Sequence, residues 1–240
     1  MAADGFSLGR RLYAFGFLAL IAVLIAWSAI SEYAALSSLQ SGFYITSWKK
    51  NRGITDDAEF DQALASSRTA LILNPYNADY FLEAANLYEW GAIRYPAWTP
   101  QAHKFRGKAI DNYRRSVTLR PSWGYAWAHL SHSKILDQQF DDETFIAFER
   151  AMIMAPWATD VQRKVVWSGF VMWEFLPPEQ KDLFLETIKR VLKTPYQIKY
   201  LSKMAVHAGW EKNLWPLINN ESDKRHLEEA VARFNKKRKR

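Results

Sequence analysis

The pattern of hydrophobic and polar positions changes sharply at one place near the N-terminus. Residues 12–30 read LYAFGFLALIAVLIAWSAI and contain no charged side chain, whereas Arg10 and Arg11 lie directly before this run and Glu32 follows it. As a helix rising about 1.5 Å per residue, the run is roughly 28 Å long, close to the thickness of the hydrocarbon core of a bilayer. A helix also satisfies its own backbone hydrogen bonds in lipid. The pattern therefore predicts a single transmembrane helix over residues 12–31.

Two other interpretations of this run are open. A cleaved signal peptide has an apolar core of about 7–15 residues and a small-residue cleavage site, which Ser28, Ala29 and Ser31 allow. The run is longer than that, and Trp27 lies near its far end, where an interfacial anchor is expected. A buried core helix would be apolar on one face only, whereas this run is apolar all round. We therefore favour a retained anchor.

Basic residues beside the run predict its orientation. The two arginines abut it, which indicates a short cytoplasmic tail over residues 1–11 and a domain on the opposite side of the membrane. Lys49, Lys50 and Arg52 favour the opposite orientation. They lie at the edge of the region near the membrane in which basic residues influence topology. The sequence thus favours a single-pass protein with its N-terminus in the cytoplasm.

The segment 32–54 continues the apolar pattern more weakly. Its apolar stripe consists of Ala34, Leu36, Leu39, Phe43 and Trp48, with serines and glutamine between them. Asn51-Arg52-Gly53 then predicts a helix end, because Asn and Gly tolerate the left-handed conformation of a C-cap. We expect a juxtamembrane helix and linker that lies against lipid or docks on the domain.

From Thr55 onward the sequence has a helical pattern, lacks strand-like alternation, and is interrupted at prolines. Pro75, Pro121 and Pro156 each end one helical run and start another. They are 46 and 35 residues apart, and the longer interval contains an insertion over residues 94–101, RYPAWTPQ. The chain therefore reads as all-α with an internal repeat.

Small and large residues recur at fixed offsets from these prolines. Twelve positions before the prolines are Ala63, Ala109 and Thr144, and five positions before them are Ala70, Ser116 and Ala151. Six positions after the prolines are Phe81, Trp127 and Gln162. Small residues let two antiparallel helices approach within about 8–10 Å, and such pairs must stack to bury their apolar faces. A generic helical domain with prolines in its turns is the alternative reading.

This arrangement resembles the tetratricopeptide repeat in its period and in its Ala, Ala and Pro positions, over about residues 55–175. The third unit departs from the pattern at Thr144 and Gln162, and the Trp-Leu-Gly opening is missing. The resemblance implies a helical-repeat solenoid behind the transmembrane helix. Residues 176–235 then form C-terminal helices, the last of them capped at Asn220, and 236–240 form a basic tail.

Composition and charge limit the possible functions. The chain has 240 residues, 49% of them hydrophobic and 15% aromatic, and it has no cysteine. Disulfides and thiolate chemistry are therefore excluded. Five of the seven excess positive charges are assigned to Lys236, Lys237, Arg238, Lys239 and Arg240. Because the remaining body is nearly balanced, we expect no nucleic-acid partner.

Residues with catalytic or metal-binding chemistry are sparse. His129 and His132 share a helix face, but a metal site needs at least a third ligand. The acidic groups Asp56-Asp57 and Asp141-Asp142-Glu143 open helices, where carboxylates cap free amides. Phosphate-loop, nucleophile-elbow and zinc-protease motifs are absent from the sequence. We expect no enzyme, no metal and no cofactor.

Aromatic and basic residues are the better candidates for contacts. We predict contacts to a ligand or partner at Tyr95 and Trp98, which lie in the insertion, and at Trp123 and Trp127. Most other aromatic residues at helical spacing are expected in the core. Arg10, Arg11 and the basic tail 236–240 are predicted to touch anionic lipid or a polyanion such as an acidic polysaccharide.

Two stretches carry a further resemblance. LNPYNADYFLEAANLYEWGA (73–92) and RPSWGYAWAHLSHSKI (120–135), behind one N-terminal anchor, resemble VpsP-like polysaccharide biosynthesis proteins of Gram-negative bacteria. The resemblance implies an inner-membrane accessory protein with a periplasmic domain that serves exopolysaccharide synthesis or export. We expect a scaffold for the proteins of such a machine. The alternatives are a polysaccharide-binding protein and a scaffold of a secretion or pilus machine.

Overall fold

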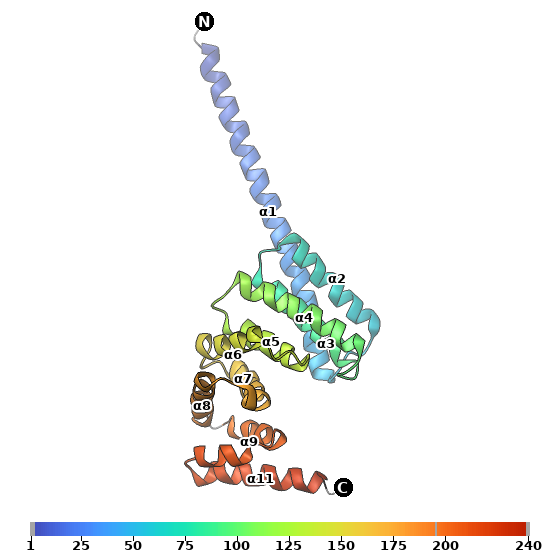
Figure 1. Cartoon of the computed structure of the whole chain (residues 1–240). Coiled ribbons are helices and arrows are strands. Elements are labelled where there is room, and N and C mark those ends of the chain that lie inside the picture. Colours follow the sequence, from blue (N-terminus) through green and yellow to red (C-terminus); the bar gives the residue numbers. More distant parts are fainter. Residues whose placement is uncertain (1–2, 195, 239–240) are drawn as a thin grey trace.

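The computed structural model describes residues 3–194 and 196–238, and within them every regular element is a helix (Figure 1). The elements are α1 (Ala3–Asn51), α2 (Asp57–Leu73), α3 (Ala78–Ile93), α4 (Pro100–Leu119), α5 (Gly124–Leu136), α6 (Asp142–Met154), α7 (Thr159–Met172), η1 (Trp173–Phe175), α8 (Pro178–Leu192), α9 (Ile198–His207), α10 (Glu211–Leu214), η2 (Trp215–Leu217) and α11 (Glu221–Arg238). The predicted all-α class is confirmed.

Helix α1 is far longer than the predicted transmembrane segment. Its residues 10–30 are all exposed, and this half projects from the rest of the molecule as a rod (Figure 1). The most apolar 18-residue window of the helix has a mean hydropathy of 2.3 and is not buried at all. The chain therefore has one helix that is long and apolar enough to cross a membrane.

The second half of α1 packs into the domain without any break in the helix. Ala34, Ile45 and Trp48 are buried at helical spacing, and this half lies against α2 and α3. The opposite face, with Leu36 and Phe43, stays exposed. The segment expected as a juxtamembrane helix and linker is thus the first helix of the domain.

The predicted end of this helix over 51–53 is present. Arg52, not Asn51 or Gly53, takes the left-handed conformation, with a φ of 59°. The Gly53 amide donates to the Trp48 carbonyl at 3.0 Å, which closes the helix. The chain then turns back into α2, whose N-cap is Asp56.

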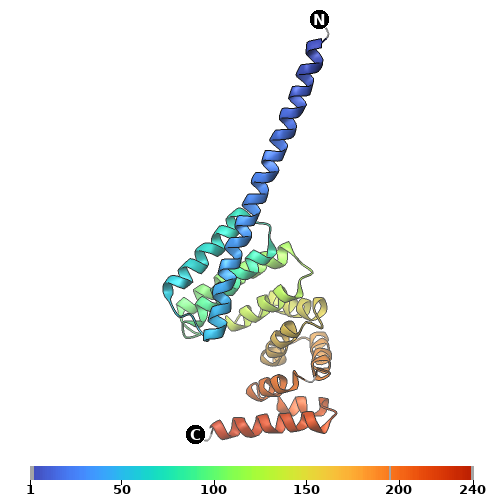
Figure 2. The same ribbon diagram turned by 180° about the vertical axis from the view of Figure 1, so that it is seen from behind.

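The helices form consecutive pairs that stack along one direction (Figures 1 and 2). The pairs are α1 with α2, α3 with α4, α5 with α6, α7 with α8, and α9 with α11. Successive pairs are linked through contacts of α1 with α3, of α4 with α5, of α5 with α7 and of α7 with α9. The chain is therefore a tetratricopeptide-like helical-repeat solenoid, and its stacking extends past both ends of the range 55–175.

The small residues at the repeated offsets lie where the paired helices touch. Exposure is at most 1% for Ala63, Ala109, Thr144, Ala70, Ser116 and Ala151. Backbones approach closely there because no large side chain intervenes. The predicted packing role of the small residues is confirmed, and Thr144, a departure from the pattern, is buried at the same position.

The departure at Gln162 replaces one hydrogen bond by an equivalent one. In the second unit, Trp127 Nε1 donates to the carbonyl of Pro121 at 2.7 Å. In the third unit, Gln162 Nε2 donates to the carbonyl of Pro156 at 2.8 Å. In these two units the proline carbonyl in the turn thus accepts from the side chain at offset +6, whereas Phe81 at the same offset of the first unit has no donor to offer.

Helix caps follow the sequence closely. The side chains of Asp56 and Asp141 accept from the Ala58 and Thr144 amides at 2.9 and 3.0 Å, as predicted for these acidic groups. Asn220 accepts from the Asp223 amide at 2.8 Å at the start of α11. That helix continues to Arg238, so the basic tail is helical as far as it is described. Lys239 and Arg240 lie outside the described residues, as does Pro195 in the turn before α9.

Candidate functional site

The four predicted contact aromatics do not gather at one place. Trp98 lies in the α3–α4 loop with 77% of its surface exposed. Tyr95, in the same loop, stacks on Phe105 with 5.9 Å between ring centroids. Trp123 stacks on Tyr125 at 6.0 Å, and the indole of Trp127 is held by the turn carbonyl already described. Among these four, Trp98 presents the largest free surface.

A second group of aromatics was not singled out from the sequence. Tyr76, Trp157 and Tyr196 are 82%, 71% and 89% exposed, and each directly follows a proline in a turn between helix pairs. The sequence does contain a signal for this group, because the residue directly after the proline is aromatic in three of the four turns. These side chains give the turns between pairs an aromatic edge.

Polar side chains converge where the first helices of three pairs meet. We call Glu89 of α3, His129, His132 and Ser133 of α5, and Lys164 of α7 the inner cluster. Ser133 donates to Glu89, and His129 Nδ1 lies 3.9 Å from Glu89 Oε2. His129 Nδ1 also lies 3.0 Å from the hydroxyl of Tyr113, and the His132 ring stacks on Trp167 at 4.5 Å.

The charges of the inner cluster are set by its burial. Burial opposes ionisation of Glu89, but neighbouring His129 and the charge of Lys164 outweigh it and hold the pKa of Glu89 well below its ordinary value. Burial and then the charge of Lys164 lower the pKa of His129 to about 4 and that of His132 to about 3. Burial also lowers the pKa of Lys164. At neutral pH the cluster therefore holds a carboxylate between two neutral imidazoles.

Perturbed pKa values of this kind occur both in reaction centres and in structural networks. Here the imidazole rings of His129 and His132 are covered by Tyr125 and Trp167. Among the described residues, no group of three or more His, Asp or Glu side chains is placed to hold a metal ion. The arrangement of the inner cluster is that of a polar link between α3, α5 and α7.

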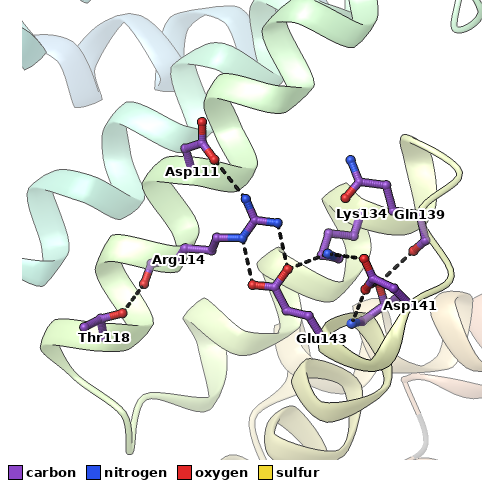
Figure 3. A network of polar contacts seen from close by, with 8 residues as sticks. Asp111, Arg114, Thr118, Lys134, Gln139, Asp141 and Glu143 are labelled. Carbon is purple, nitrogen blue, oxygen red and sulfur yellow. Dashed lines mark hydrogen bonds and ion pairs between the residues drawn. The ribbon is translucent and has the colours of Figure 1, made fainter.

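A second network joins α4, α5 and α6 (Figure 3). Arg114 binds both carboxylate oxygens of Glu143, with two contacts of 2.7 Å. The buried side chain of Lys134 donates to Glu143 and, at 2.9 Å, to Asp141. The bond to Arg114 lowers the pKa of Glu143. These contacts fix one helix pair against the next, a role that the sequence did not predict for Glu143.

The last helix pair forms a hollow lined with positive charge. This basic groove, of about 630 Å³, lies between α9 and α11. Its basic side chains are Lys199, Lys203 and His207 from α9 and His226, Arg233, Lys236 and Lys237 from α11. The sequence pointed to Lys236 and Lys237 as part of a tail, but it gave no sign that α9 brings further lysines beside them.

Comparisons with known proteins do not identify a family for this chain. A scan against protein-family models finds no match, and a search of curated proteins finds none either. Among solved structures, the chain is similar to the crystal structure of MamA, with 17% sequence identity and a TM-score of 0.48. The match covers 76% of this chain and 93% of that chain. The assignment as a helical-repeat solenoid rests on the helix pairing of this chain itself.

Proposed function

We propose that this chain is a membrane-anchored, non-enzymatic scaffold that holds partner proteins at a fixed height and orientation beside a membrane. One observation carries the proposal. The apolar run 12–30 and the buried residues 34–48 belong to a single helix, α1, with no flexible linker between them. A solenoid offers a long binding surface, and a rigid anchor defines where that surface lies.

The finer context of this proposal comes from the resemblance in residues 73–92 and 120–135. It suggests that the partners belong to a machine for exopolysaccharide synthesis or export. The N-terminus would lie in the cytoplasm and the solenoid in the periplasm, as the flanking arginines favour. A secretion or pilus machine is the neighbouring possibility, and the identity of the partners separates the two.

Direct polysaccharide binding is the second candidate function. The exposed rings of Trp98, Tyr76, Trp157 and Tyr196 favour it, because flat aromatic faces stack on sugars. Binding of purified exopolysaccharide that is lost in Trp98→Ala would support this function. An unchanged affinity in that variant would count against it.

A helical-phase experiment tests the scaffold. Two alanines inserted after Ile30 rotate the solenoid by about 200° relative to the membrane segment, so that it faces nearly the opposite way. Seven alanines return it to within about 20° of its original facing and move it roughly 10 Å farther from the membrane. Photo-crosslinkers placed at exposed Tyr76 and Trp98 report the neighbours in cells. We expect crosslinks to synthesis or export proteins and polymer output to fall with two alanines and to recover in part with seven.

The outcomes are distinct. Equal behaviour of the two insertions would show that orientation does not matter and would contradict the rigid scaffold. Crosslinks to secretion or pilus proteins instead would keep the scaffold and replace its context. Normal crosslinks and output from a chain that lacks residues 1–31 would remove the need for the anchor.

A further inference from the structure

The basic groove between α9 and α11 has features that stacking alone does not require. We propose that it binds an acidic segment of a protein partner that carries apolar side chains at intervals among its carboxylates. This inference rests on the proposed scaffold function and names the chemistry of one of its partners.

Charge is the first argument. Five Lys and Arg residues and one glutamate, Glu229, give the groove a net charge of +4 when its two histidines are neutral. Glu229 pairs with Arg233 at 3.2 Å. In the described part of the chain, the four lysines of the groove form no ion pair. Like charges gathered this closely repel one another, so an anionic occupant is favoured electrostatically.

The floor of the groove is the second argument. It consists of Val206, Ala230 and Phe234, and Val206 is only 6% exposed. Phe234 meets His207 edge to face, with 5.1 Å between ring centroids. An apolar floor below a basic rim matches a segment with both carboxylates and apolar side chains, and a volume of about 630 Å³ lies in the usual range of binding sites.

Other anionic occupants fit less well. The groove lies at the end of the molecule opposite to the apolar run of α1, which separates it from the lipid that this run enters (Figures 1 and 2). A polysaccharide presents many hydroxyl groups, which need acceptors as well as donors. Among the described residues that line the groove, Glu229 is the only carboxylate, and it is already paired with Arg233. A protein segment is the occupant that uses both the rim and the floor.

Fluorescence anisotropy with the full chain tests the proposal. The chain is held in phosphatidylcholine nanodiscs, and the probe is a fluorescein-labelled peptide of glutamates with leucine at every third or fourth position. Lys203→Glu/Lys237→Glu reverses one unpaired cation on each wall of the groove. Arg68→Glu/Lys104→Glu makes the same charge change at exposed sites on α2 and α4. We expect about tenfold weaker binding for the groove pair, equal to about 1.4 kcal/mol, and little change for the control pair.

Three results would overturn the inference. An equal loss in both pairs would mean attraction to net charge alone. A peptide with serine in place of leucine that binds equally well would mean that the floor is unused. Polygalacturonate that binds in preference to the peptide would assign the groove to acidic polysaccharide. These binding measurements use purified components and test only the groove. The crosslinking experiment in cells tests the scaffold, so a negative result for one proposal can be told apart from a negative result for the other.

Discussion

Single residues of this chain act mainly through buried hydrogen bonds and charge pairs. Thr144 shows this well: it stands where alanine is usual, and its hydroxyl donates at 2.7 Å to the carbonyl of Gln139 in the turn before α6. A threonine is therefore accepted at a fully buried position, because its polar group has a partner. The inner cluster follows this rule only in part: Ser133 donates to Glu89, whereas His129 Nε2 and His132 Nδ1 are buried without a hydrogen-bond partner among the described residues.

The inner cluster predicts loss of stability at acid pH. The pKa of His129 is about 4 in the folded chain and about 6.5 when unfolded, so below pH 6.5 the unfolded state takes up a proton that the folded state refuses. Stability should therefore fall as the pH drops from 6.5 to 4, by up to about 3 kcal/mol for this residue. Thermal melts of the full chain in detergent across this range measure the effect.

Replacement of the imidazoles checks the assignment. His129→Gln should flatten the pH dependence of the melting temperature, and His129→Gln/His132→Gln should flatten it further. A dependence as steep in the double variant as in the unmodified chain would show that other groups cause the acid instability.

At the scale of elements, the close approach of paired helices depends on small residues. Gly169 of α7 faces Phe184 of α8, and a Cβ placed there would lie 2.2 Å from the ring of Phe184. Gly107 of α4 has no atom within 4 Å of the equivalent Cβ position. The two glycines are thus a natural pair for comparison, since both lie inside helices.

Alanine substitution at these two sites should have opposite effects. Gly169→Ala forces α7 and α8 apart and should cost about 2 kcal/mol or more of unfolding free energy. Gly107→Ala removes only backbone freedom and should stabilise the chain by up to about 1 kcal/mol. Chemical denaturation of both variants gives the difference, and a stabilising effect at Gly169 would refute the close packing of this pair.

Much of the element pattern could be read from the sequence. Prolines, small residues and acidic caps predicted the helices after Thr55, because each acts within one turn or one helix pair. The role of residues 32–51 could not be decided, since an apolar stripe packs equally well on lipid or on protein. Pairing with α2 and α3 settles the matter, and it depends on contacts between segments distant in the sequence, such as that of Ser41 with Glu83 at 2.7 Å.

At the scale of the whole molecule, the order of parts along the stack is the main result. The apolar run of α1 lies at one end, the polar links between pairs in the middle, and the basic groove at the other end (Figure 1). The apolar run and the basic C-terminal residues were evident in the sequence, but the contribution of α9 to the groove was not. That information requires the packing of α9 on α11, which no local pattern contains.

The continuity of α1 is the claim on which the scaffold depends, and a distance measurement tests it directly. Since the chain has no cysteine, spin labels at Leu24→Cys and Thr46→Cys attach only at these exposed positions of α1. Pulsed electron resonance on the full chain in lipid nanodiscs should give one narrow distribution near 33 Å, as 22 residues of helix rise about 1.5 Å each. A broad distribution, or one centred at a clearly shorter distance, would show a hinge between the apolar run and the solenoid and would contradict the account.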